Sequence, residues 1–286
     1  MCAYSGACSG AYSDAYSFAI AGIGMQICCD QPRLLEKLAQ RYAGFQQTSP
    51  ASPQFTLHLN WQRGPSDASR VSPLFTLRGD QLYFDVPHYS GQIDLARAEA
   101  SLSLISDYPV SDVDYFLRVA YALLLFRAGG ILVHGAGIVR AGRGYLFFGH
   151  SGSGKTTVAR LSPNDLVLND DLIAIMPGEG NWAAWSTPFW NFSQVRPAPG
   201  HAPLTALYRL VQAVDVRRER MLAGQAAAEL VASTPVLPAD PPSLVQLLGR
   251  YTQLLAVVPA YRLYFLPDDS FWPAAATTEE FAGHDL

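Results

Sequence analysis

The chain has 286 residues, of which 49% are hydrophobic and 15% charged, and this allows one large domain or two modest ones. The formal net charge of -4 argues against a nucleic-acid partner, while the low charged fraction favours a homo-oligomer or a partner that covers apolar surface. No apolar run reaches the roughly 18 residues of a membrane span, and the N-terminus lacks a signal-peptide pattern. We therefore expect a cytoplasmic protein with no membrane partner.

The N-terminal segment is rich in small residues and repeats the triplet Ala-Tyr-Ser. Residues 1–17 are expected to form a tail that is flexible or docked on the body. The four cysteines are Cys2, Cys8, Cys28 and Cys29, and none has C-x-x-C spacing. Reduced thiols are the expectation for a cytoplasmic protein.

Residues 18–110 are predicted to form an antiparallel β-rich region with one helix. The pattern is strand-like from Phe18 to Cys28, an amphipathic helix opens at Pro32, and apolar alternation returns over residues 55–61. Further strand candidates are residues 82–86, 93–95 and 98–105. His58 is expected to face solvent from its strand, and the region shows no catalytic constellation.

Residues 111–286 are predicted to form a second domain. Ser111 to Asp114 can cap a helix that stops at Gly129-Gly130. Strands are expected at residues 131–134, 136–139, 145–148, 166–168, 173–176, 182–185 and 261–265, and helices near 224–233 and 243–255. The segment Arg217-Arg218-Glu-Arg220 is interpreted as a solvated helix face.

Lys155 is one of two lysines in a chain with 18 arginines, and it follows the loop Gly149-His-Ser-Gly-Ser-Gly154. The segment Gly149–Thr156 fits G-x-x-x-x-G-K-[ST], in which backbone N–H groups cradle phosphates, Lys reaches the β/γ oxygens and Ser/Thr binds Mg²⁺. An apolar strand is predicted before the loop, and a short helix that ends before Pro163 is predicted after it.

ATP and Mg²⁺ are therefore the expected cofactors. The residues expected to contact the nucleotide are those of the loop and the first turn of the helix. They are Gly149, Ser151, Gly152, Ser153, Gly154, Lys155, Thr156 and Thr157.

Two neighbouring carboxylates, Asp170 and Asp171, follow the buried strand predicted at residues 166–168. A carboxylate that ends a strand after a phosphate loop is where a Mg²⁺ ligand belongs. Because neighbours in a strand face opposite sides, only one of the pair can point straight at the nucleotide. The structural alternative is an Asx-type turn that closes the strand.

Three segments together resemble the HPr kinase/phosphorylase family in order and spacing: Leu132-Val-His134-Gly, the loop Gly149–Thr156, and Leu168-Asn-Asp170-Asp171. Members of that family phosphorylate a serine of a carrier protein and are fold relatives of phosphoenolpyruvate carboxykinase. A weaker similarity over about residues 200–272 is to HPr-kinase-related proteins found beside peptide-modification genes. The resemblance implies an α/β fold, with an HPr-kinase/PEP-carboxykinase-like P-loop domain and a β-rich (α+β) N-terminal region.

The resemblance also implies a role for each site residue. Lys155 would neutralise the β/γ-phosphates, and Thr156 would hold Mg²⁺. Asp170 would be the general base that accepts the proton of a substrate hydroxyl, while Asp171 would support the metal or the base. His134 would lie near the transferring phosphoryl group.

One segment departs from the family. HPr kinases carry Glu-x-Arg-Gly-x-Gly-Ile after the double Asp, whereas this chain has Pro188-Phe-Trp-Asn-Phe-Ser-Gln-Val-Arg196, with no carboxylate. The difference argues against HPr as the substrate, against a reverse phosphorylase reaction and against a second metal ligand.

The sequence therefore predicts an ATP- and Mg²⁺-dependent kinase that acts on a hydroxyl, a serine of a peptide or small protein such as a ribosomal peptide precursor. Two alternatives stay open: a kinase for a small molecule, and a sensor or scaffold that binds ATP and transfers nothing. An open groove bordered by Trp182, Trp185, Phe189 and Trp190 would suit a peptide, and a closed polar pocket would suit a metabolite.

Overall fold

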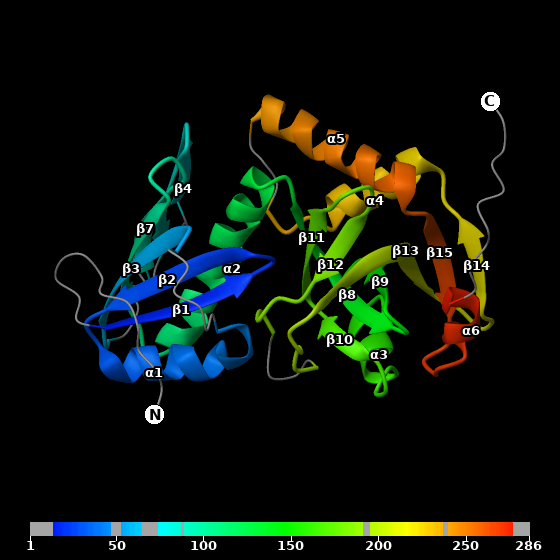
Figure 1. The fold of residues 1–286 in the computed structure, drawn as a ribbon, viewed down its shortest axis with the longest axis horizontal. Coiled ribbons are helices and arrows are strands. Elements are labelled where there is room, and N and C mark those ends of the chain that lie inside the picture. Colours follow the sequence, from blue (N-terminus) through cyan, green and yellow to red (C-terminus); the bar gives the residue numbers. More distant parts are fainter. Residues whose placement is uncertain are drawn as a thin grey trace. The chain divides into compact units, whose positions relative to one another are not determined.

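A computed structural model of the chain describes residues 14–46, 53–64, 74–86, 89–190, 195–236 and 240–276. The fold is mixed α/β, and the chain forms two compact units, Met1–Gly129 and Gly130–Leu286, each with its own sheet (Figure 1). Within the described ranges, no helix is both long enough and apolar enough to cross a membrane.

The first unit contains a seven-stranded sheet in the order β1-β2-β3-β7-β6-β5-β4. Its strands are β1 (Asp14–Ile20), β2 (Ile23–Cys29), β3 (Phe55–Gln62), β4 (Leu74–Arg78), β5 (Gln81–Val86), β6 (Tyr89–Asp94) and β7 (Glu99–Ile105). The prediction of an antiparallel region is wrong at the centre, where β3 is parallel to both β2 and β7. Parallel pairing of β2 with β3 requires a crossover, and the helix α1 (Pro32–Arg41) lies in it.

The segment predicted as one strand from Phe18 to Cys28 is a hairpin. Ala21 and Gly22 have φ of 51° and 80°, as a two-residue type I′ connection requires, and they reverse the chain between β1 and β2. Because β1 begins at Asp14, the end of the segment predicted as a tail belongs to the sheet; residues 1–13 lie outside the described ranges.

The expectation that the cysteines are reduced does not hold for Cys28, which is disulfide-bonded. Its partner lies outside the described residues. Cys29 is a buried free thiol, and burial raises its pKa to about 11. Cys29 is therefore protonated and unreactive at neutral pH.

The helix α2 (Pro109–Arg127) belongs to the first unit and not to the predicted second domain that begins at residue 111, so the division of the chain follows this helix. α2 begins two residues before Ser111, with Pro109 at its first position, so no Ser/Asp cap is used. It packs against α1 and the sheet, with Phe116 against Phe84 and the Tyr121 hydroxyl donating to the Ile23 carbonyl.

Asp114, which was predicted to cap α2, is buried between α1 and α2 instead. Its carboxylate accepts hydrogen bonds from Arg41 and Arg118, with ion-pair distances of 3.2 and 3.3 Å, and from the Tyr42 hydroxyl at 3.0 Å. The buried charge therefore joins the two helices.

The second unit begins at β8 and contains eight strands and four helices within its described residues. These are β8 (Ile131–Arg140), β9 (Arg143–Phe148), α3 (Lys155–Arg160), β10 (Leu166–Asn169), β11 (Leu172–Pro177), β12 (Trp182–Trp185), β13 (His201–Gln212), β14 (Arg217–Arg220), α4 (Ala223–Ala232), α5 (Pro241–Val257), β15 (Ala260–Phe265) and α6 (Phe271–Ala276). The predicted hairpin of β11 and β12 is confirmed, as are the helices α4 and α5 and the strand β15. The two strands predicted before β9 are the single strand β8.

The pairings of the second unit form a closed circuit. β8 pairs with β11 through residues 131–134 and with β9 through residues 135–140, and β12 and β9 both pair with β13. The ring β8-β11-β12-β13-β9 therefore returns to its start, with β15 and β14 continuing from β13. β9, β10, β13 and β15 all run in the same direction, so their C-terminal ends lie at one edge.

The segment Arg217–Arg220, interpreted as a helix face, is the strand β14. It pairs antiparallel with β15, and its guanidinium groups lie over aromatic rings of that strand, Arg217 at 3.7 Å from the centroid of Tyr264 and Arg218 at 4.8 Å from that of Tyr261. These cross-strand cation–π contacts favour a strand, and they depend on a partner that comes about 40 residues later in the chain.

Candidate functional site

The glycine loop, defined here as residues Gly149–Gly154, connects β9 to α3 in the strand–loop–helix context that the motif requires. Gly154 has φ of 110°, and a Cβ there would collide with the ring of Phe265 at the end of β15. The Gln212 side chain at the end of β13 donates to the Gly152 carbonyl at 2.8 Å. The C-terminal ends of β13 and β15 therefore form the floor that shapes the loop.

The side chain of Lys155 is buried and folds back onto the loop. Its Nζ donates to the carbonyl oxygens of Gly149 and His150 at 2.9 and 3.0 Å. An ordinary surface loop does not bury an ammonium group in this way.

Burial is the main cause that lowers the pKa of Lys155. The nearby carboxylates of Asp171 and Asp170 counteract it, while the positive charge of Arg209 adds to the lowering. The pKa therefore reflects two carboxylates and a second cation close to the loop.

Asp170 follows β10 and is 1% exposed. One carboxylate oxygen, Oδ2, accepts a hydrogen bond from the Val195 amide at 3.5 Å, and the Thr156 side chain also hydrogen-bonds to this carboxylate. The other oxygen, Oδ1, is buried without a hydrogen-bond partner among the described residues, and so is Ser153 Oγ in the glycine loop. Burial raises the pKa of Asp170, with a smaller raising effect of Asp171 and a lowering effect of the Thr156 and Val195 hydrogen bonds.

Asp171 pairs with His134 of β8, with 3.1 Å between Oδ1 and Nε2. The His134 side chain is 41% exposed, whereas that of Asp171 is 12% exposed. The Asp171 carbonyl also accepts from the Gly135 amide at 2.9 Å, so the backbone of β8 holds the double Asp in place.

Asn169, which is not among the predicted site residues, organises the turn that carries both carboxylates. It is fully buried, and its Oδ1 accepts from the Asp171 amide at 2.7 Å. Its Nδ2 donates to the carbonyls of Thr187 and Phe189, both at 2.9 Å. The Asx-type turn that closes β10 is therefore formed by Asn169 and not by either carboxylate.

The structure therefore brings Lys155, Thr156, Asp170, Asp171 and His134 together at one edge of the sheet. Ser151 is exposed, and Thr157 lies in the first turn of α3. The residues that support the loop were not predicted from the sequence; they are Gln212, Phe265, Arg209 and Glu229. No local motif marks them, because each comes from a strand or helix distant in sequence.

The four aromatic residues expected to border a peptide groove have mixed environments. Trp182 and Phe189 are buried in the core, and Trp185 stacks on His201 with 3.9 Å between ring centroids. Two of the four residues therefore fill the interior.

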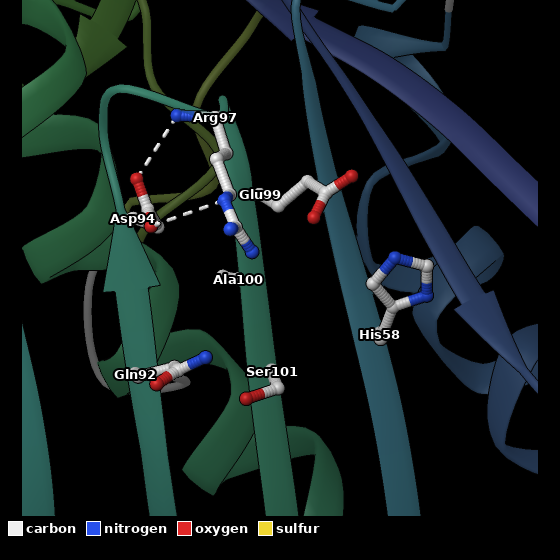
Figure 2. Close-up of a pocket in the computed structure, with 7 residues that line it drawn as sticks. All are labelled: His58, Gln92, Asp94, Arg97, Glu99, Ala100 and Ser101. Carbon is white, nitrogen blue, oxygen red and sulfur yellow. Dashed lines mark hydrogen bonds and ion pairs between the residues drawn. The ribbon is translucent and has the colours of Figure 1, made fainter. Parts of the chain in front are cut away.

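Two cavities lie away from the glycine loop. Figure 2 shows one of about 300 Å³ on the sheet of the first unit, with His58 pointing toward it from β3 and Gln92, Asp94 and Ser101 from β6 and β7. His58, which was expected to face solvent, is half-buried there. The other cavity, of about 410 Å³, lies beyond the end of α3 beside Arg140 and Trp272.

No family model matches the sequence, and a comparison with curated proteins finds no match. Among solved structures, the Hpr(Ser) kinase/phosphatase from Coxiella burnetii is similar over 47% of this chain and 84% of its own, at 9% sequence identity and a TM-score of 0.28. Similarity at this level does not establish a family.

Proposed function

We propose that the chain is a kinase that uses ATP and Mg²⁺ to phosphorylate a hydroxyl, a serine of a peptide or small protein. The observation that carries the proposal is a pair of buried side-chain oxygens, Asp170 Oδ1 and Ser153 Oγ, without a hydrogen-bond partner in the described part of the chain. Burying such groups unpaired costs free energy. Ser153 lies in the loop that also buries the ammonium group of Lys155, and Asp170 is hydrogen-bonded to Thr156, which follows the loop. A ligand with anionic oxygens and a bound cation would therefore supply partners for the two unpaired oxygens and a counter-charge for Lys155.

The donor set fits the expected cofactors. A serine hydroxyl, a lysine and the amides of a glycine loop that leads into a helix are donors for polyphosphate oxygens. Thr156 and Asp170 offer the hard oxygen ligands that Mg²⁺ prefers, and Mg²⁺ binds through one or two carboxylates together with substrate phosphates. Within the described ranges, no group of three or more His, Cys, Asp or Glu side chains is placed to hold a metal ion. The proposed Mg²⁺ site therefore depends on phosphate oxygens of the nucleotide.

The contacts favour a division of labour between the two carboxylates. Asp170 is hydrogen-bonded to Thr156, so these two residues would hold Mg²⁺, which when bound neutralises charge on the β- and γ-phosphates. Asp171 is oriented by the partly exposed His134 and is the more exposed of the two carboxylates, so we assign it to the incoming hydroxyl. This division reverses the roles implied by the resemblance, in which Asp170 is the base.

In the proposed reaction, the substrate hydroxyl oxygen forms a bond to the γ-phosphorus as the bond to the β,γ-bridging oxygen breaks and ADP leaves. Asp171 accepts the hydroxyl proton, and His134 keeps the carboxylate aimed at it. Lys155 and the loop amides stabilise the charge on the phosphate oxygens. The acceptor class follows from the resemblance of the His134, glycine-loop and double-Asp segments to HPr kinases.

The test is to incubate the full chain with γ-labelled ATP, Mg²⁺ and serine-containing peptides, and to measure ATP binding separately by calorimetry. We expect label on a serine hydroxyl, and weaker ATP binding with loss of transfer in Lys155→Ala. Asp171→Asn is expected to bind ATP and Mg²⁺ normally but to transfer at least about 100-fold more slowly. Asp170→Asn is expected to bind ATP but to lose the strengthening of that binding by Mg²⁺.

Other results assign the alternatives. Tight ATP binding with no labelled hydroxyl in any peptide, amino acid or sugar would favour the sensor or scaffold. Label on a free amino acid or sugar alone would identify a small-molecule kinase. If Asp170→Asn abolishes transfer while its ATP binding still responds to Mg²⁺, Asp170 is the base.

A further inference from the structure

Arg209 lies beside the glycine loop, although no motif includes it. β13 runs parallel to β9, and their register pairs Arg209 with Phe148, the residue that precedes the loop. The guanidinium Nη1 is 3.5 Å from the position that a Cβ on Gly149 would occupy. The side chain is only 17% exposed. A second cation therefore lies beside the loop that buries Lys155.

The contacts of Arg209 orient it without using its whole guanidinium group. Nε donates to Glu229 Oε2 of α4 at 3.1 Å, and Nη1 donates to the Leu210 carbonyl. Among the described residues, no hydrogen bond uses Nη2. Glu229 is 37% exposed, so its charge is partly screened by water and compensates Arg209 incompletely.

Lys155 donates to the Gly149 carbonyl and Arg209 lies beside Gly149, so two cations are close to one loop and repel each other. Glu229 and the Asp170–Asp171 pair offset part of this repulsion, and an anion bound between Lys155 and Arg209 would offset more of it. A polyphosphate is such an anion, and a guanidinium is suited to phosphate oxygens.

We propose that Arg209 is a second phosphate-binding cation of this site, positioned by Glu229 so that it contributes to the affinity for the polyphosphate of the nucleotide. The proposal rests on the proposed function, because it concerns the same glycine loop. A purely structural Arg209 would serve only to join β13 to α4, and the two roles predict different responses to substitution.

The test uses the full chain and measures the binding of inorganic pyrophosphate, and of ATP without Mg²⁺, by titration calorimetry. We expect Arg209→Gln to weaken both affinities about tenfold, the size of one lost charge-assisted contact, and Arg209→Lys to restore most of the loss. The matched control is Arg262→Gln, on β15, where Arg262 is the register partner of Arg209 one strand further from β9. Its affinities are expected to stay within about twofold of the unmodified chain, because Arg262 lies one strand further from the glycine loop than Arg209 does.

The proposal is overturned if Arg209→Gln binds both anions like the unmodified chain, or if Arg209→Gln and Arg262→Gln weaken binding equally. If Arg209→Gln does not fold, Glu229→Gln tests the same idea. That variant keeps the cation and, in the amide oxygen, the acceptor for Nε that positions it, but it removes the counter-charge. Pyrophosphate is therefore expected to bind about threefold tighter, and unchanged or weaker binding would count against the proposal. If Arg209→Gln binds pyrophosphate and ATP normally while Lys155→Ala does not bind them, only the role proposed for Arg209 is wrong. If the unmodified chain binds neither anion, the proposed function is wrong as well.

Discussion

Asp170 and Lys155 both lie where folding makes their charged forms less favourable. Burial raises the pKa of Asp170 and lowers that of Lys155. Each residue carries charge into an interior that a protein selected only for stability would fill with apolar groups. Such local conflicts concentrate at functional sites, because a ligand of opposite charge relieves them.

Asp170 therefore makes stability depend on pH in a defined direction. Because its pKa is raised, the folded chain holds the carboxyl proton more tightly than the unfolded chain does. Its contribution to stability is fully present below the ordinary Asp pKa of about 3.9 and is lost as pH rises through the folded pKa. We expect Asp170→Asn to stabilise the ligand-free protein by about 1 kcal/mol at pH 7, with the difference disappearing near pH 4.

Thermal unfolding at a series of pH values measures this effect. Asp215→Asn, which alters an exposed carboxylate, serves as the control and is expected to change stability by less than about 0.5 kcal/mol. An Asp170→Asn variant that is less stable at pH 7, or whose advantage grows toward acid, would contradict the assignment.

Gly154 is the second residue whose environment makes a sharp prediction. Alanine there combines a φ of 110° with a methyl group directed at the buried Phe265 ring. We expect Gly154→Ala to lose about 2–3 kcal/mol of stability and to bind ATP much more weakly, as measured by thermal unfolding and calorimetry. Gly224→Ala, at an exposed helical position with no atom within 4 Å of the added Cβ, should instead gain about 0.5 kcal/mol. Equal behaviour of the two variants would show that Phe265 does not constrain the loop.

Among the elements, α1 and α2 are joined by the charge of Asp114. The carboxylate contacts Arg41, Arg118 and Tyr42, and removing it would leave two largely buried guanidinium groups without this counter-charge. We expect Asp114→Ala to lower the free energy of unfolding by about 3 kcal/mol, as measured by urea denaturation. Asp107→Ala, which breaks the exposed pair with Arg63, should cost less than about 0.5 kcal/mol. A loss for Asp114→Ala as small as that of the control would mean that helix packing alone joins α1 to α2.

The elements that could be predicted from sequence are those whose signal is local. α1 has Pro32 at its start and an apolar stripe, β3 has alternation, and the hairpin of β11 and β12 has a Pro-Gly turn. β14 could not be predicted, since its arginines are organised by Tyr261 and Tyr264 of a strand that comes later. The same holds for the site. The residues of the motif could be predicted from the local sequence, whereas the contacts of Gln212 and Phe265 with the loop depend on the fold.

At the scale of the whole molecule, each unit has its own sheet and its own buried residues, and the chain passes between them at Gly129-Gly130. All residues of the proposed kinase site belong to the second unit. We expect a fragment of residues 130–286 to unfold cooperatively and to bind ATP within about tenfold of the full chain, because domains with their own core generally fold as units. Circular dichroism and calorimetry test this, and a fragment without a cooperative transition would show that the second unit needs the first.

The contact of the glycine loop with Phe265 has a consequence during synthesis, because the chain is made from its N-terminus. Lys155 and the loop leave the ribosome before Phe265, which is encoded roughly 110 residues later. At about 5–20 residues per second, the nascent chain carries the complete motif for roughly 5–20 s without the side chain that shapes it. ATP can therefore act as a folding ligand only late in synthesis, and a message truncated before β15 would encode every residue of the motif and still produce a chain whose loop lacks its floor.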